Sequence, residues 1–169
     1  MLLLDSPHYH ERRTKEPLSH DGGQILRMVI NRLSIPREAW VYDYCCLEDK
    51  EHLPKKKKER LMTLSSNIRR VHERIRLNEP CVIVGMGKLP CEVLTDASLV
   101  TSKAGTCWRT KDFGKVWITY SPDAALFDPV LIVDIYGVLA NAAKAAGIEI
   151  EFNPYVPMFN WEAYEHHKI

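Results

Sequence analysis

Four short apolar runs, separated by segments with helical periodicity, limit what this chain can fold into. They cover residues 1–4, 41–46, 81–84 and 116–120. Each run is nearly continuous rather than alternating, as is typical of strands buried on both faces of a parallel sheet. Parallel strands need right-handed crossovers, which place helices on both faces. The pattern predicts an α/β fold: a three-layer α/β/α sandwich with a central, mostly parallel four-stranded sheet.

Three segments with helical periodicity supply crossovers for this sheet. Residues 23–33 carry apolar side chains on one face. Apolar residues spaced by three and four over residues 61–75 predict one long helix with a basic opposite face. A further helix is predicted over residues 130–146, and Gly147 is expected to end it.

The chain has 169 residues, enough for one domain with a hydrophobic core. We expect this domain to cover residues 1–150. The Pro- and aromatic-rich residues 151–169 are expected to form a tail that packs on the domain or on a partner, with a short strand over residues 148–152. No apolar window reaches the roughly 18 residues of a membrane span, so no membrane partner is expected. Five irregularly spaced cysteines predict reduced thiols in a cytoplasmic compartment.

Positive charge is concentrated in one segment, although the net charge of the chain is only +1. Between Lys50 and Arg76 there are ten Lys and Arg residues and three acidic residues. Four of the basic residues are consecutive: Lys55, Lys56, Lys57 and Lys58. Such a patch favours a polyanionic partner, and a solvated helix face is the alternative interpretation.

Polar and glycine residues follow the predicted strands. In a parallel α/β sheet, ligands bind outside the carboxyl ends of the strands. The candidates at these ends are, in chain order, Asp5, Ser6, His8, Tyr9, Asp43, Gly85, Gly87, Lys88, Ser121, Leu126 and Phe127. Their position alone is also compatible with ordinary polar loops, so the order of the surrounding motifs matters more.

Six short motifs occur in order along residues 1–148. They are L-D-S-P-H, P-L-S-H-D-G-G-Q-I-L, Y-D, V-I-V-G-M-G, A-G-T-C-W and Y-S-P-D-A. The series resembles that of the uracil-DNA glycosylase superfamily, most closely family 4 and the phage DNA polymerase-related proteins. Their motifs are G-E-A-P-G, P-F-x-G-x-A-G-Q-L-L, T-N, V-I-V-x-L-G-x-x-A, R-G-x-W and H-P-A. The resemblance implies base flipping and hydrolysis of an N-glycosidic bond in DNA.

The resemblance assigns roles to residues of the first and third motifs. Asp5 stands where the family has the acid or amide that orients the attacking water, although an Asp that caps a turn is equally compatible with this position. Asp43 replaces the asparagine that reads the base, and Ser6 is a further base-contacting candidate. An ionised carboxylate only accepts hydrogen bonds, so an unusual or modified base is expected rather than plain uracil.

Two further positions have changed type. Leu18 replaces the aromatic residue that stacks on the base, and Tyr9 or Tyr44 is a candidate substitute. Ser121 replaces the histidine that stabilises the departing base, and a hydroxyl carries no positive charge. Histidines of the first two loops are candidates to compensate for this loss: His8, His10 and His20.

The remaining assignments concern DNA contacts. Backbone amides of the glycine turn are expected to bind phosphate, and an apolar wedge to enter the base stack. The residues assigned in this way are Gly85, Gly87 and Lys88 in the turn, Lys103 and Gly105, the wedge Leu126 and Phe127, and Lys55, Lys56, Lys57 and Lys58. The alternative for the wedge is that it begins the core face of the last helix.

Cofactors are not expected. His8 and His10 could form a metal pair, but no second pair follows at fixed spacing. Family 4 proteins carry an iron–sulfur cluster on four cysteines, and the cysteines of this chain lack that spacing. The sequence therefore predicts no metal, cluster or other cofactor.

Three functions remain open from the sequence. The first is a DNA glycosylase-like hydrolase of N-glycosidic bonds, acting on single- or double-stranded DNA. The second is an inactive glycosylase-like module that binds DNA or a replication partner such as a DNA polymerase, because four functional positions have changed type. The third is an enzyme of nucleotides or modified nucleosides that uses the same pocket without DNA.

Overall fold

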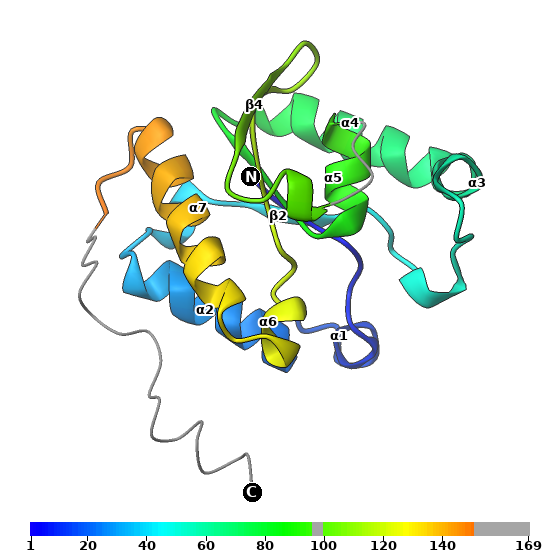
Figure 1. Cartoon of the computed structure of the whole chain (residues 1–169), viewed down its shortest axis with the longest axis horizontal. Helices are drawn as coiled ribbons and strands as arrows, with labels where there is room; N and C mark the ends of the chain where they lie inside the picture. Colours follow the sequence, from blue (N-terminus) through cyan, green and yellow to red (C-terminus); the bar gives the residue numbers. More distant parts are fainter. Residues whose placement is uncertain (96–99, 151–169) are drawn as a thin grey trace, which may run out of the picture.

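The computed structural model describes residues 1–95 and 100–150, which form a mixed α/β domain around a five-stranded sheet (Figure 1). The strand order is β2-β1-β3-β5-β4. Four strands run parallel, namely β1 (Leu2–Leu4), β2 (Tyr42–Tyr44), β3 (Ile83–Met86) and β5 (Gly114–Thr119). The α/β class and the mostly parallel sheet are therefore confirmed.

The prediction of four strands is corrected by β4 (Cys107–Thr110), which pairs antiparallel with β5 at the sheet edge. This strand alternates between exposed and half-buried residues because only one of its faces meets the core. A search for continuous apolar runs therefore does not find it. Gly114, at a φ of +69°, closes the hairpin that returns into β5.

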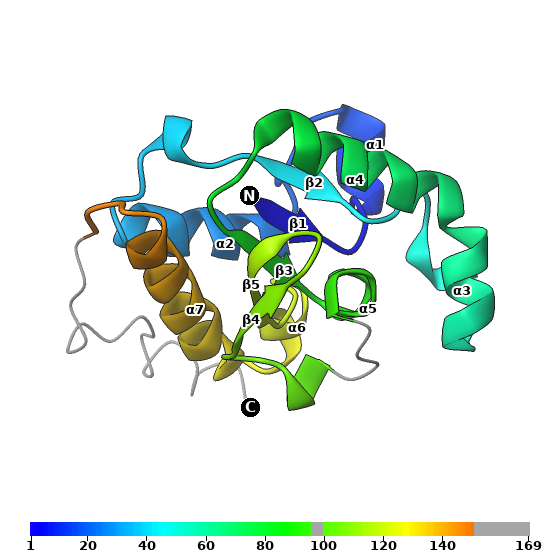
Figure 2. The ribbon, with the colours of Figure 1, turned by 90° about the horizontal axis from the view of Figure 1, so that it is seen from above.

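The sheet separates two hydrophobic cores (Figure 2). Leu2 and Leu4 face one core, which α2 (Asp21–Arg32) and α7 (Leu131–Ala145) complete. Leu3 faces the other core, with α4 (Ser65–Asn78) and α5 (Lys88–Thr95). The alternation along β1 follows from the two-residue period of a strand, and it explains why this strand is apolar throughout.

The long helix predicted over residues 61–75 is two helices, α3 (Lys57–Thr63) and α4. Leu64 separates them and is 1% exposed. The buried guanidinium of Arg60 bonds Glu92 of α5 at 2.9 Å and also the carbonyls of Pro54 and Lys55. These contacts fix α3 to the body of the protein independently of α4. A periodicity that continues through the break cannot reveal it.

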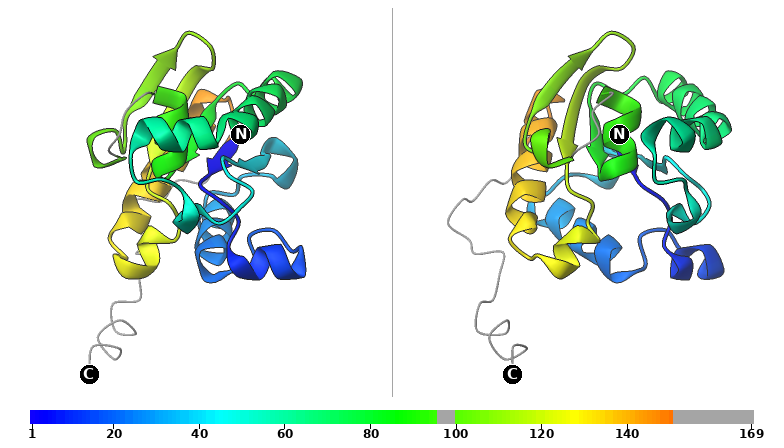
Figure 3. Two further views of the ribbon diagram at one scale, coloured as in Figure 1. Left: turned by 90° about the vertical axis from the view of Figure 1, so that its right-hand side faces the viewer. Right: turned by 45° about the vertical axis from the view of Figure 1, so that its right-hand side comes forward.

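The carboxyl ends of the parallel strands lie beside two short helices and a 3-10 turn (Figure 3). These elements are α1 (Tyr9–Thr14), α6 (Ala124–Phe127) and η2 (Lys50–His52). Two further 3-10 turns cover Arg37–Ala39 and Val100–Ser102. Since β1 lies between β2 and β3, the crossovers diverge there, which makes this edge the expected place for a ligand.

The described part of the chain ends at Ile150, which packs against the core formed with α2 and α7. Residues 148–150 are not in a strand, and the rest of the predicted 148–152 strand lies outside the described residues. The predicted tail at 151–169 lies outside them as well. Among the described helices, none has the length and apolar character required to cross a membrane.

Candidate functional site

A hollow at the carboxyl edge of the sheet has a volume of about 520 Å³. This outer cavity is lined by His8, His10, Ser19, His20, Asp21, Lys50, Glu51, Asp123, Leu126 and Phe127. Its walls come from α1, η2, α6 and the start of α2. The volume lies in the range of small-molecule sites, so a nucleotide fits by size.

A smaller hollow, the inner recess, has a volume of about 10 Å³. It is lined by Leu4, Asp5, Ser6, Leu18, His20, Gly23, Tyr44, Ser121, Pro122 and Asp123. Four predicted site residues therefore meet here: Asp5, Ser6, Leu18 and Ser121. His20 and Asp123 line both hollows. The recess is large enough for only one water molecule, so a base can enter it only after it enlarges.

Asp5 follows β1 directly, and the whole residue is 8% exposed. Oδ1 accepts a hydrogen bond from Leu89 N at 2.8 Å, and Oδ2 accepts one from Lys50 Nζ at 3.1 Å. Burial raises the pKa of Asp5, although Lys50 and the Leu89 amide act in the opposite direction. A buried carboxyl group with a raised pKa is a candidate acid or base.

Gly87 allows the close approach of Asp5 to the start of α5. It has a φ of +113°, and a Cβ there would lie 2.6 Å from the Asp5 carboxylate oxygens. The sequence predicts that this turn, with Gly85 and Lys88, binds a phosphate. In the structure the carboxylate of Asp5 takes the amide of Leu89 at this helix end, while Gly85 lies within β3 and packs against Ile118.

Lys50 lines the outer cavity and reaches Asp5 from η2. Its side chain is 39% exposed. Burial acts to lower the pKa of Lys50, but Asp5, with Asp123 and Glu51, more than offsets this effect and raises the pKa. The Lys50–Asp5 pair is therefore an ion pair with one partner buried and the other facing the cavity.

His20 lies between two carboxylates. Its Nε2 is 2.7 Å from Asp123 Oδ1, and its Nδ1 is 3.3 Å from Glu11 Oε2. The second contact is electrostatic, because its angles do not fit a hydrogen bond. Burial acts to lower the pKa of His20, but Asp123 and Glu11 more than offset it and raise the pKa. The hydrogen bond from His20 lowers the pKa of Asp123. His8 stacks on the His20 ring, with the ring centroids 4.9 Å apart.

Glu11 holds the loop that carries these histidines. This carboxylate is 4% exposed and accepts hydrogen bonds from His8 N at 2.7 Å, Tyr44 Oη at 3.1 Å and Leu18 N. Leu18 is buried with a φ of +54°, so it lines the recess from a constrained backbone position. Glu11 thus connects β2, α1 and the segment before α2.

Asp43 lies on the sheet face that α4 covers, and it lines neither hollow. Arg70 Nη1 donates to both carboxylate oxygens at 2.7 and 2.8 Å, and Arg74 Nε donates at 3.3 Å. Its Oδ1 also accepts from the amide of Tyr44. The predicted base reader therefore has its acceptors occupied within the protein.

The predicted wedge is exposed rather than part of the core of α7. Leu126 is 44% and Phe127 is 89% exposed, and both line the outer cavity. Val130 and Val133 continue this exposed apolar surface along the chain. Tyr9, in α1, is 65% exposed and lines neither hollow.

The other predicted DNA contacts lie outside both hollows. Lys103 Nζ packs 3.7 Å from the centre of the Trp108 ring, and Gly105 has a φ of +78° with open space around it. Lys88 is exposed at the start of α5. The lysine segment, Lys55 to Lys58, runs into α3 from the loop that Arg60 anchors.

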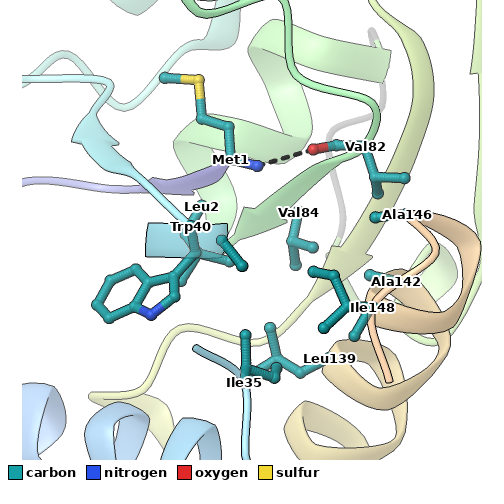
Figure 4. Close-up of a pocket in the computed structure, with 12 residues that line it drawn as sticks. Met1, Leu2, Ile35, Trp40, Val82, Val84, Leu139, Ala142, Ala146 and Ile148 are labelled. Carbon is teal, nitrogen blue, oxygen red and sulfur yellow. Dashed lines mark hydrogen bonds between the residues drawn. The ribbon is translucent and has the colours of Figure 1, made fainter. Parts of the chain in front are cut away.

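A third hollow, of about 60 Å³, lies at the opposite, amino edge of the sheet (Figure 4). Figure 4 shows Leu2, Trp40, Val84 and Leu139 around it, and Met1 N donating to Val82 O at 2.8 Å. Its lining has no charged side chain. The side chains around it therefore offer a mainly apolar surface.

Metal ligands are not grouped in the described ranges, 1–95 and 100–150: no cluster there has three or more His, Cys, Asp or Glu placed to hold an ion. All five cysteines are free thiols. Burial raises the pKa of Cys45, whose thiol also lies near the charges of Asp5 and Asp43. Such a thiol is a structural residue rather than a nucleophile.

The sequence does not reveal two important members of this site, Glu11 and Lys50. Glu11 lies three residues after His8, and its side chain accepts a hydrogen bond from the His8 backbone amide. This short-range spacing is the only signal for Glu11 in the sequence. Lys50 lies six residues beyond β2, in a segment read only as part of a basic patch. Asp123 belongs to the predicted strand-end loop, but its pairing with His20 spans 103 positions.

The chain was compared with protein-family models and with curated proteins, and neither comparison found a match.

Proposed function

We propose that this chain binds DNA and hydrolyses an N-glycosidic bond to release an unusual or modified base. The proposal rests on the motif resemblance and on one structural observation. A buried carboxylate, Asp5, and an imidazole held between two carboxylates, His20, line the same recess at the carboxyl edge of the sheet. A carboxylate can orient the attacking water, and a protonated imidazole can stabilise the departing base.

Asp5 is suited to act on the sugar. A carboxylate beside the anomeric carbon orients a water molecule and stabilises the positive charge that develops on the ring as the base leaves. Its contacts with Leu89 N and Lys50 fix the carboxylate before substrate arrives. Such preorganisation lowers the cost of reaching the transition state.

His20 is suited to act on the departing base. Asp123 and Glu11 favour the protonated imidazole, which can stabilise the negative charge of the leaving base. Ser121 cannot provide this charge, and His20 binds the residue two positions after it. The structure therefore supports His20, of the three candidate histidines, as the replacement for the missing family histidine.

The base is expected to be read by hydroxyl groups. Ser6 and Ser121 line the recess, whereas Asp43 is bound to arginines on another face. A hydroxyl both donates and accepts hydrogen bonds, so it tolerates several base edges. The exposed pair Leu126 and Phe127 is placed at the outer cavity, where it can support the gap left by a flipped nucleotide.

A DNA-binding module without cleavage is the second candidate. It is favoured by the small volume of the recess, about 10 Å³, and by the occupied acceptors of Asp43. In this case the lysine segment and the outer cavity would hold DNA, or a replication partner such as a DNA polymerase would bind beside it.

Mass spectrometry of released bases distinguishes the two candidates. Single-stranded and duplex oligonucleotides would carry uracil, hypoxanthine, xanthine, 5-hydroxymethyluracil or modified cytosines. We expect release of one or more bases, with a loss of about 100-fold or more in Asp5→Ala. Asp112→Ala, an exposed residue of the β4–β5 hairpin, is the matched control. DNA binding without release would favour the second candidate, and absence of both would reject the two proposals.

A further inference from the structure

Lys50 places a primary amine in the outer cavity next to a buried carboxylate. Its Nζ lies 3.1 Å from Asp5 Oδ2, and the side chain remains 39% exposed. Within the described ranges it is the only lysine or arginine that lines either hollow. A purely structural partner for Asp5 would not need to face the cavity, whereas this amine is open to a bound substrate.

We propose that Lys50 gives this chain a second activity, the cleavage of DNA at abasic sites by β-elimination, with Lys50 Nζ as the nucleophile and Asp5 as the group that carries protons. The activity rests on the proposed function, because release of a base leaves an abasic sugar in the outer cavity. The step itself starts from abasic DNA of any origin, so it can be measured separately.

The covalent step uses the ring-opened form of the abasic sugar, which has an aldehyde at C1′. The neutral amine of Lys50 adds to C1′, and the resulting carbinolamine loses water to form a protonated imine. Removal of a proton from C2′ then breaks the C3′–O bond, and the 3′ phosphate leaves with the bonding electron pair. Water hydrolyses the imine, which restores Lys50 and leaves an unsaturated aldehyde on the upstream strand. No oxidant or reductant is needed.

Asp5 can carry the protons of this sequence. At rest the two groups form an ion pair, and the attraction of Asp5 keeps Lys50 protonated. An acceptor for the Lys50 proton lies across the 3.1 Å contact, namely the Asp5 carboxylate, whose pKa is raised by burial. Asp5 then returns that proton to the hydroxyl group that leaves as water. The restored carboxylate can take the proton from C2′.

The lysine segment close to Lys50 in the sequence favours a DNA strand as the substrate, whereas the acids around the Lys50 ammonium do not attract phosphate. Asp123 and Glu51 are the other acids that act on the Lys50 ammonium. Lys50 precedes the lysine segment by only a few positions, so phosphates held by Lys55 to Lys58 would direct the backbone past η2. The sugar is thereby brought to the amine.

The test uses the full chain and an oligonucleotide with one preformed abasic site. Sodium borohydride reduces the imine and traps a covalent protein–DNA adduct, which peptide mass spectrometry assigns to a residue. We expect the adduct on Lys50, together with a product ending in the unsaturated aldehyde. Lys50→Arg and Lys50→Gln should lower both signals about 100-fold or more, since neither side chain forms an imine. Lys115→Arg, in β5 away from the cavities, is the matched control and should keep them.

An adduct on another lysine or on the terminal amine, or trapping that is unchanged in Lys50→Arg, would overturn the proposal. Mapping of the adduct in the unaltered chain does not depend on whether a variant folds. The substrate already lacks its base, so a chain that releases no base can still pass this test. A chain that releases a base but gives no adduct refutes the lyase step alone.

Discussion

Asp5 illustrates how a functional carboxylate can reduce stability. Burial raises its pKa, so ionisation of Asp5 lowers the free energy of unfolding. This loss develops as the pH rises from the usual pKa of the group through its folded-state pKa. Asp5→Asn removes the charge and keeps an acceptor for Leu89 N, while the half-exposed Lys50 can return to water. We expect Asp5→Asn to show no fall in Tm at neutral pH. Thermal unfolding between pH 5 and 8, with Asp112→Asn beside it, measures this. A Tm several degrees below that of the control would show that Asp5 is structural.

His20 has the same direction of linkage to pH as Asp5, because both pKa values are raised in the folded protein. Its pKa is raised above the usual value of 6.5, so its contribution to stability is complete below pH 6.5 and is lost as the pH rises through the folded-state pKa. Asp123→Asn removes the closer partner and should lower the pKa of His20. It should also move the alkaline limb of the activity profile to lower pH. Titration of the His20 ring by NMR measures the first effect, and an unchanged pKa would show that Glu11 alone holds the proton.

At the scale of elements, the close packing of α2 against α6 is set by a glycine. A Cβ at Gly22 would lie 2.2 Å from Asp123 Oδ1 and 2.9 Å from His20 Nε2, whereas one at Gly137 in α7 would meet nothing within 4 Å. We expect Gly22→Ala to cost about 1–3 kcal/mol of unfolding free energy and to separate His20 from Asp123. Gly137→Ala should instead gain about 0.5–1 kcal/mol, because alanine is the better helix former. Urea unfolding of both variants checks this, and equal effects would contradict it.

Elements with a continuous pattern of apolar residues were predictable from the sequence. Elements whose boundaries depend on contacts between distant residues were not. The apolar runs indicated all four parallel strands, because burial on both faces leaves a local pattern. The boundary between α3 and α4 depends on Arg60 reaching Glu92, which lies 32 positions away. The edge strand β4 has a mixed pattern because one of its faces is open to solvent.

For the whole molecule, the parallel topology predicted which edge of the sheet carries the site. It did not predict which side chains pair with one another there. Asp5, Ser6, Leu18 and Ser121 meet as expected at one recess. The contacts that define their chemistry come from loops whose paths no periodicity fixes, such as Lys50 reaching Asp5 over 45 positions. Asp43 occupies a position of the third motif, yet its side chain lies on the other face of the sheet, where Arg70 binds it.

Binding of DNA by the whole surface is tested through its dependence on salt. The lysine segment enters α3 at its N-terminal end, where positive charge is unfavourable for a helix, and Lys56 pairs with Glu59 at 3.4 Å on the exposed surface. We expect replacement of Lys55 to Lys58 by glutamine to weaken DNA binding and to reduce the slope of log K against log salt by up to about 0.9 for each lost phosphate contact. Tm should not fall. The matched controls are Lys111 and Lys115, in the hairpin that joins β4 to β5 (Figure 1). Their replacement by glutamine should leave the slope unchanged. An equal slope in both sets would place the DNA elsewhere on the protein.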